Sequence, residues 1–255
     1  MSEIIFKKEG HLAYIKLNRP ESLNAINRAM ADALIEAWLT FREDRDLWVA
    51  IIYGEGKAFC AGADVKEMER GRWKFRQSLI FGEKPFGPSN YDVWKPVIAA
   101  THGHVNGAGL WLALECDMRI SADNALYGTR ETKANVPALI APFLSDYLPR
   151  GIAAELMFTA KPLDAERAYQ MGLINRVVPQ SELLAATEKI AKTICENGPL
   201  SVWASKEMSQ RTRYMDYKSA LSLVEHIATP VWNSEDSRDA KQAFIEKRKP
   251  TWKLR

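Results

Sequence analysis

The sequence predicts an α/β fold in which a largely parallel sheet is followed by a helical C-terminal part. Apolar runs at residues 48–53, 96–100 and 118–121 have the length and composition of buried strands. Helical patterns lie between these runs, and the repeated order strand, helix, strand is typical of parallel sheets. From Gly151 onward the pattern predicts helices only. The 255 residues are enough to form one large domain with a sizeable core.

The first elements are marked by their turns and caps. Residues 4–7 and 12–17 are expected to pair as a hairpin around Glu9-Gly10. A helix is expected over residues 29–41, with Asn27 as its N-cap and one apolar face. The strand 48–53 follows this helix. The order of these elements places one helix between two buried strands.

The later elements are less uniform. Asp64 is expected to open a short charged helix, and residues 110–115 are expected to form another. Residues 70–94 mix aromatic and charged side chains with glycine and proline, which is typical of a lid or a substrate-contacting loop. Asp164 and Ser181 are expected to be N-caps. The predicted C-terminal helices are residues 152–158, 164–171, 181–196, 200–214, 217–228 and 235–246.

The composition limits the possible partners and the compartment. Lys plus Arg number 35 and Asp plus Glu 32, and this balance argues against a nucleic-acid or membrane partner. The three cysteines show neither metal-ligand spacing nor a disulfide framework, so we expect no metal site and reduced thiols in a cytoplasmic protein. No apolar run is long enough to cross a bilayer, and the N-terminus lacks the pattern of a signal peptide.

Two turns rich in small residues carry the functional signal. Residues 56–68, GKAFCAGADVKEM, follow the strand 48–53 and lead into a helix. Residues 101–110, THGHVNGAGL, repeat this arrangement after the strand 96–100. Small side chains let a ligand approach the backbone closely, and free N–H groups at such turns can hold an anionic oxygen. Each turn could also be an ordinary strand–turn–helix junction. Together they could aim two N–H groups at one oxygen, which stabilises an enolate or a tetrahedral oxyanion.

Over nearly its whole length the chain resembles the crotonase superfamily, also called the enoyl-CoA hydratase/isomerase family. Residues 57–68 resemble the first oxyanion turn of that family. Residues 95–100, together with His102-Gly103, Gly107-Ala108-Gly109 and Cys116-Asp117, resemble the second. Residues 158–160, 172–178 and 243–250 match the family's later segments.

The resemblance implies a fold and a substrate class. It implies a ββα spiral acyl-CoA-binding core, here residues 1–195, and a C-terminal helical region, here residues 196–255, that drives assembly into a homotrimer or a dimer of trimers. The substrate is expected to be an acyl-CoA thioester, with coenzyme A as part of the substrate and no permanently bound cofactor. By position, the N–H groups of Ala63 and Ala108 are the oxyanion donors. The residues expected to bind substrate or coenzyme A are Ser22, Leu23, Ala25, Ala61, Asp64, Val65, Lys66, Gly107 and Trp111.

The chain departs from the hydratase pattern at one catalytic position. Members with hydratase activity typically use two glutamates. The first corresponds here to Trp111 and the second to Glu131, so one carboxylate is retained. Glu115 lies one helical turn beyond Trp111, which moves it away from the oxyanion turn. A single carboxylate can still shuttle a proton, and an indole would exclude water and contact a bulky or cyclic acyl group. As an alternative, Glu131 is a surface carboxylate beside Arg130.

Three functions remain open from the sequence. The first is a hydratase/isomerase-type reaction with Glu131 as the acid–base group. The second is a decarboxylase or C–C lyase of the same family. The third is a catalytically weak acyl-CoA-binding protein, which Trp111 keeps possible because it replaces a catalytic carboxylate.

Overall fold

A six-stranded sheet forms the centre of the molecule. The structure is a computed structural model that describes residues 2–69 and 85–255. The strand order is β1-β2-β3-β4-β6-β9, in which β1 and β2 are antiparallel and the remaining neighbours are parallel. The strands are β1 (Ile4–Glu9), β2 (Leu12–Leu17), β3 (Val49–Gly54), β4 (Val97–Thr101), β6 (Met118–Ala122) and β9 (Arg176–Val178). The predicted hairpin and the largely parallel sheet are therefore confirmed.

A smaller sheet lies beside the first and was not predicted. It has the order β5-β7-β8, with β5 (His104–Asn106) parallel to β7 (Leu126–Gly128) and β8 (Leu163–Asp164) antiparallel to β7. The expectation of helices only after Gly151 is wrong, because β8 and β9 both lie in that part of the chain. Strands of two or three residues are too short to show an alternating pattern, so periodicity cannot detect them.

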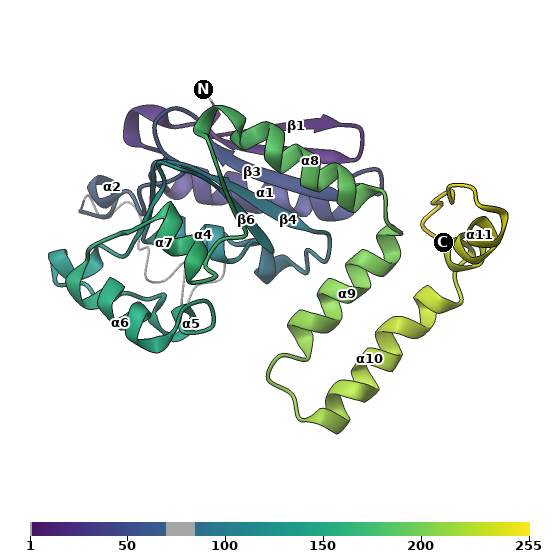
Figure 1. Cartoon of the computed structure of the whole chain (residues 1–255). Coiled ribbons are helices and arrows are strands. Elements are labelled where there is room, and N and C mark those ends of the chain that lie inside the picture. The colour runs from purple at the N-terminus through teal and green to yellow at the C-terminus, as the bar shows by residue number, and fades with distance from the viewer. Residues whose placement is uncertain (1, 70–84) are drawn as a thin grey trace.

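Helices cover both faces of the large sheet, as Figure 1 shows for α1 and α8. One face packs on α8 (Leu183–Cys195) through residues such as Ile51 and Ile98. The other face packs on α1 (Arg28–Glu43) and α4 (Ala108–Leu114) through residues such as Ile52 and Ala99. Neighbouring residues of one strand thus enter different cores, as expected when a parallel sheet is buried on both faces. The shorter helices are α2 (Val65–Glu69), α5 (Ala141–Leu144), α6 (Arg150–Thr159) and α7 (Ala165–Gln170).

The structure confirms two of the predicted N-caps. The Asn27 side chain accepts a hydrogen bond from Met30 N, and the Asp164 side chain accepts one from Arg167 N. Ser181 is not an N-cap, because it lies within a 3₁₀ turn, η4 (Gln180–Glu182), directly before α8. The other 3₁₀ helices are η1 (Pro20–Ser22), η2 (Pro88–Tyr91) and η3 (Glu131–Ala134).

The last three helices extend away from the sheet (Figure 1). They are α9 (Pro199–Arg211), α10 (Tyr217–Trp232) and α11 (Glu235–Glu246). Lys95 joins α9 to the core: its Nζ donates to Phe41 O at 2.9 Å and lies 5.1 Å from the centre of the Trp203 ring. Burial lowers the pKa of Lys95 to about 8.

The basic C-terminal tail is folded back onto α11. The buried carboxylate of Asp236 accepts hydrogen bonds from Lys253 N at 2.8 Å and Leu254 N at 3.0 Å. Arg248 pairs with Asp239 at 2.6 Å, and Arg255 pairs with Glu235 at 3.1 Å. Acidic side chains of the same region thus take up part of the tail's positive charge.

Candidate active site

The first turn places the N–H group of Ala63 away from the neighbouring chain. Gly62 O accepts from Ile26 N at 2.8 Å, and Asp64 N donates to Ile26 O at 2.9 Å. Because neighbouring residues of an extended segment alternate, the N–H of Ala63 points to the other side. Among residues 2–69 and 85–255, no acceptor for it is found. Gly62 has a φ of +121°, a conformation that favours glycine and that redirects the chain at this point.

The second turn leads directly into α4. Gly107 has a φ of +51° and its N–H donates to Gly128 O at 3.0 Å, which fixes the turn on β7. Ala108 is the first residue of α4, so its N–H has no partner within the helix. In the described part of the chain it has no other acceptor either. Ala108 therefore offers a main-chain donor despite carrying a methyl group.

The two turns are joined by hydrogen bonds and by close packing. Cys60 N donates to His104 O at 3.0 Å, and Asn106 N donates to Cys60 O at 3.0 Å. Gly109 lies so close to Cys60 that an added Cβ would be 2.7 Å from the Cβ of Cys60. A side chain at position 109 would force the turns apart. The two unpaired N–H groups thus belong to one rigid arrangement.

Glu131 lies against the second turn. It begins η3 just after β7, and a Cβ added to Gly107 would be 3.0 Å from Glu131 Oε1. Its Oε2 atom is buried and has no hydrogen-bond partner among the described residues. Burial raises the pKa of the Glu131 carboxyl group, although nearby main-chain N–H groups partly oppose this. This placement argues against the alternative of a solvated surface carboxylate.

Trp111 and Glu115 form a pair on the one face of α4 that is not fully buried. The indole Nε1 donates to the Glu115 carboxylate, which also accepts from the Ser89 hydroxyl group. Burial raises the pKa of Glu115, and the hydrogen bonds from Ser89 and Trp111 oppose this effect. The Phe143 ring meets the indole edge-on, with 5.6 Å between ring centres. Glu115 was expected to lie away from the second turn, and its contact with Trp111 was not predicted, although the spacing of four residues could have suggested it.

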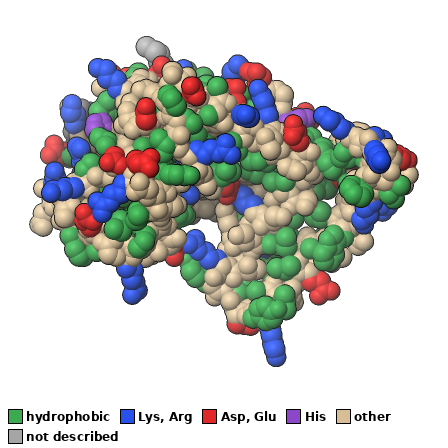
Figure 2. Space-filling view, in the orientation of Figure 1, with side chains coloured by type: hydrophobic (Ala, Val, Ile, Leu, Met, Phe, Trp, Pro, Cys, Tyr) green, Lys and Arg blue, Asp and Glu red, His purple; other side chains and the backbone are tan. Residues whose placement is uncertain are grey.

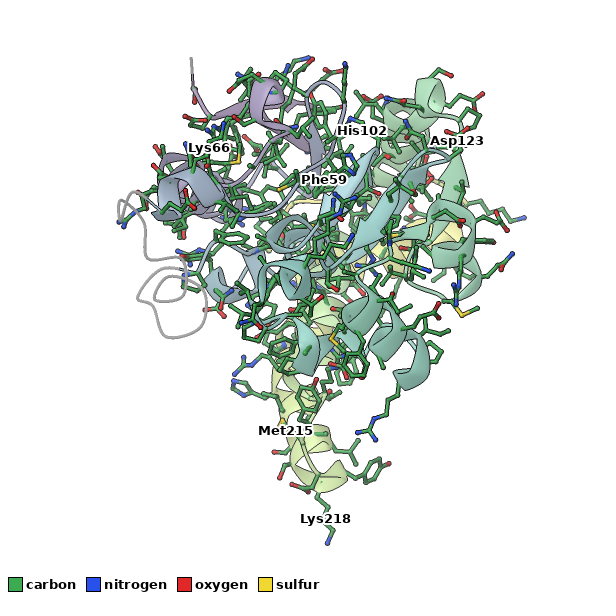
Figure 3. The ribbon with its side chains drawn as sticks, turned by 90° about the vertical axis from the view of Figure 1, so that its left-hand side faces the viewer. Phe59, Lys66, His102, Asp123, Met215 and Lys218 are labelled. Atoms are coloured by element: carbon green, nitrogen blue, oxygen red, sulfur yellow. The ribbon has the colours of Figure 1, made fainter. Side chains whose placement is uncertain are left out.

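The residues predicted to contact coenzyme A lie around the first turn. Leu23 O accepts from Ala61 N at 2.9 Å, so the loop containing Ser22, Leu23 and Ala25 touches this turn. Asp64 pairs with Arg19 at 3.0 Å, a residue that the sequence argument did not identify. Lys66 lies at the outer rim on α2, whereas Phe59 lies in the interior of the core (Figure 3). Part of the predicted lid, residues 70–84, lies outside the described residues.

No cluster of three or more His, Cys, Asp or Glu side chains that could hold a metal ion occurs in residues 2–69 and 85–255. Within the same residues, no helix is both long and apolar enough to cross a membrane.

The chain thus combines a mixed α/β fold with two main-chain N–H groups that lack acceptors in the described residues, near a carboxylate whose Oε2 atom is buried. The family model "Enoyl-CoA hydratase/isomerase" matches residues 7–255, and the chain belongs to this family. It is an acyl-CoA-processing enzyme of the enoyl-CoA hydratase/isomerase type.

Individual relatives match along their full length. A short-chain-enoyl-CoA hydratase from Clostridium acetobutylicum is 36% identical over 256 residues, covering 98% of this chain and 97% of the relative. An (E)-benzylidenesuccinyl-CoA hydratase from Thauera aromatica is 32% identical over 254 residues, covering 98% of each chain. The crystal structure of an enoyl-CoA hydratase from Mycobacterium tuberculosis H37Rv superimposes with a TM-score of 0.91 at 32% identity, covering 99% of each chain.

Proposed function

We propose that the chain holds the thioester oxygen of an acyl-CoA between the N–H groups of Ala63 and Ala108. The support is that both N–H groups lack an acceptor in the described residues and belong to turns linked through Cys60. Charge that develops on this oxygen forms an enolate, and two fixed donors stabilise it without rearrangement. Each donor of this kind typically contributes about 3 kcal/mol to the transition state.

Glu131 is the single acid–base group in this proposal. Its carboxylate takes a proton from the acyl chain, and the electron pair of the broken C–H bond moves into the enolate. The same carboxyl group then returns a proton to the α or the γ carbon. Alternatively, the carboxylate removes a proton from a water molecule that adds to the β carbon. The buried and unpartnered Oε2 atom supports this role, because it is free to receive a proton.

Trp111 supplies an apolar wall where a second carboxylate would otherwise stand. The half-buried indole is fixed by Glu115 and Phe143. It excludes water from one side of the acyl group and makes apolar contact with that group. A site with one carboxylate and one indole favours proton transfer by Glu131 alone over activation of water by two carboxylates.

Several assignments complete the proposal. Coenzyme A contacts Ser22, Leu23, Ala25 and Lys66. The remaining residues that bind the substrate are Ala61, Asp64, Val65, Gly107 and Trp111. Residues 1–195 form the acyl-CoA-binding core, and residues 196–255 form a helical region through which the chain assembles as a homotrimer or a dimer of trimers. The protein works in the cytoplasm, without a permanently bound cofactor and without a nucleic-acid or membrane partner. The three cysteines, which are all free thiols, are compatible with this compartment.

Deuterium exchange tests the function directly. The parent protein, Glu131→Gln and Glu188→Gln are incubated in deuterated water with enoyl-, hydroxyacyl- and malonyl-type CoA thioesters. Glu188 is a matched control because its carboxylate lies on α8 and accepts a hydrogen bond from the Tyr14 hydroxyl group of the large sheet. We expect deuterium at Cα or Cγ with the parent and with Glu188→Gln, and little with Glu131→Gln. Full turnover by Glu131→Gln would contradict the assigned role. Loss of carbon dioxide from malonyl-type thioesters would favour a decarboxylase. Tight binding with neither exchange nor turnover would favour a binding protein.

A further inference from the structure

A cavity of about 690 Å³ lies next to Trp111. Its wall includes Trp111 and Leu114 of α4, the C-cap residue Glu115, and Ile140 and Phe143 from the following segment. Residues of α9 and the loop after it close the other side. Figure 2 shows a hollow between the core and the α9–α10 pair. Neither oxyanion turn contributes to this wall, and Glu131 does not either. The cavity is large enough for a ligand of ordinary size.

Trp111 lines this cavity and lies one helical turn from the proposed donor Ala108. It follows Ala108 by three residues, and its N–H donates to Gly107 O at 2.9 Å. Side chains on a helix lean back over the preceding turn, so the indole covers the beginning of α4. All the other residues of α4 are buried in the core. Trp111 is thus the residue of α4 that borders the cavity closest to the Ala108 donor.

The indole is held in place by the Glu115 carboxylate, which is itself fixed by hydrogen bonds and by packing. Glu115 accepts from Trp111 Nε1 with one oxygen, and from Ser89 with the other. Ser89 N also donates to this second oxygen, at 3.4 Å. The carboxylate sits so close to Gly87 that any side chain there would collide with it. Rotation of the indole would break its hydrogen bond and leave a buried carboxylate with fewer donors.

The charged side chains around the cavity are already paired. Asp117 pairs with Lys206 at 2.7 Å, and Asp146 pairs with Arg213 at 3.1 Å. The buried guanidinium of Arg119 donates to main-chain oxygens, including Leu173 O at 2.6 Å. An uncharged chain could therefore occupy the cavity without leaving these groups unpaired.

We infer that Trp111, positioned by Glu115, is a partition that restricts the enzyme to short acyl groups. The inference rests on the proposed function, since the acyl chain must start at the thioester held by Ala63 and Ala108. With the indole in place, a straight chain ends at the ring. If the ring is removed, the chain can continue into the cavity, where each added methylene gains apolar contact.

Calorimetric titration with saturated acyl-CoA thioesters tests the partition without requiring turnover. Free coenzyme A, butyryl-CoA and decanoyl-CoA are titrated into the parent, Trp111→Ala, Trp111→Leu and Trp94→Ala. Trp94 is a matched control because it lines the same cavity from outside α4. We expect the affinity of decanoyl-CoA relative to butyryl-CoA to rise about tenfold or more in both Trp111 variants. The ratio should not change in Trp94→Ala, and the affinity for free coenzyme A should stay constant in all proteins.

Glu115 is tested as a positioning residue through the same affinity ratio. Glu115→Ala should raise the ratio by a smaller factor than Trp111→Ala, because the ring remains but is no longer fixed. Glu115→Gln keeps an oxygen that can accept from the indole, so its ratio should stay near that of the parent. In the Trp111→Leu background, Glu115→Ala should have no further effect. A general loss of stability would not produce this pattern.

The possible failures are distinguishable. If the parent does not bind butyryl-CoA more tightly than free coenzyme A, the proposed function is refuted and the partition with it. If butyryl-CoA binds but the ratio is unchanged in Trp111→Ala and Trp111→Leu, the partition alone is refuted. The partition alone is also refuted if the parent binds butyryl-CoA and decanoyl-CoA equally well and the Trp111 variants bind decanoyl-CoA no more tightly.

Discussion

Glu131 combines a buried environment with the role of a base, and its protonation should control the rate. Burial raises the pKa of this carboxyl group. The ionised form is the active one, so kcat/KM should fall as the pH decreases through the raised pKa. This acid limb should lie above the ordinary value of 4.5. Glu131→Gln should lower kcat/KM about 100- to 10,000-fold and abolish the limb. A pH–rate profile measures both effects, and an unshifted limb would contradict the assignment.

The raised pKa of Glu131 also affects stability, and here the favourable pH is the low one. Between the ordinary and the raised pKa, the folded protein binds more protons at Glu131 than the unfolded chain does. The contribution of this group to the free energy of unfolding is therefore favourable at low pH and is lost as the pH rises through that window. At pH 7, Glu131→Gln should be at least as stable as the parent in thermal unfolding, although it is far less active.

Ala108 allows a main-chain donor to be deleted by a side-chain substitution. Proline is well tolerated at the first position of a helix, where its missing N–H has no intrahelical partner. Ala108→Pro should therefore fold but lose about 100- to 1,000-fold in kcat, because one oxyanion donor is gone. Ala108→Gly keeps the N–H and is the matched control. Steady-state kinetics with circular dichroism separates the two effects, and equal rates for both variants would exclude Ala108 as a donor.

At the scale of elements, Lys95 connects the end of α1 to α9. Its pKa of about 8 lies below the ordinary 10.5, because burial disfavours the charge. From pH 8 to 10 the unfolded chain binds more protons at this residue, so its contribution to stability rises with pH. Lys95→Met lacks this effect. The free energy of unfolding of the parent, relative to Lys95→Met, should increase over this range by on the order of 2 kcal/mol. Urea unfolding of both proteins at several pH values measures this increase. If the difference in free energy of unfolding between them does not change with pH, the lowered pKa of Lys95 is contradicted.

Elements with a strong local pattern were predictable, and elements that depend on distant partners were not. The apolar run of β4 and the cap at Asn27 were sufficient to place their elements. By contrast, β5, β7, β8 and β9 have two or three residues each and exist because another strand lies beside them.

Within the site, the spacing of residues predicted the two turns. The burial of the Glu131 Oε2 atom and the hydrogen bond from Trp111 to Glu115 depend on how η3 and η2 fold back, which sequence spacing does not encode.

At the scale of the whole molecule, apolar side chains remain exposed on the C-terminal helices. Leu221 and Trp232 on α10 are 50% and 62% exposed, and Phe244 and Ile245 on α11 are 85% and 73% exposed. Figure 2 shows hydrophobic side chains along this part of the molecule. Exposed apolar residues in such number are typical of an interface between subunits. Met215 and Lys218 mark the far end of the α9–α10 pair, well away from the core (Figure 3).

We therefore expect the purified protein to sediment as a trimer or a hexamer. Leu221→Asp and Phe244→Asp should each shift the sedimentation coefficient toward that of a monomer, because a buried carboxylate without a partner is costly. Lys241→Glu changes the charge of α11 at an exposed polar position and should leave the assembly intact. A parent protein that sediments as a monomer would contradict the proposed interface.

The buried Oε2 atom of Glu131 has a consequence for the fate of individual hydrogen atoms. Within residues 2–69 and 85–255 no group forms a hydrogen bond with this oxygen, so a hydrogen that it removes from the acyl chain has no such partner to which it can pass. It is also shielded from bulk water, so its return to the substrate competes with its escape. The same hydrogen should then often travel from one carbon to another within a single turnover. An acyl-CoA that carries tritium at the abstracted position should deliver much of its label to the product, and the solvent should gain label more slowly than product forms.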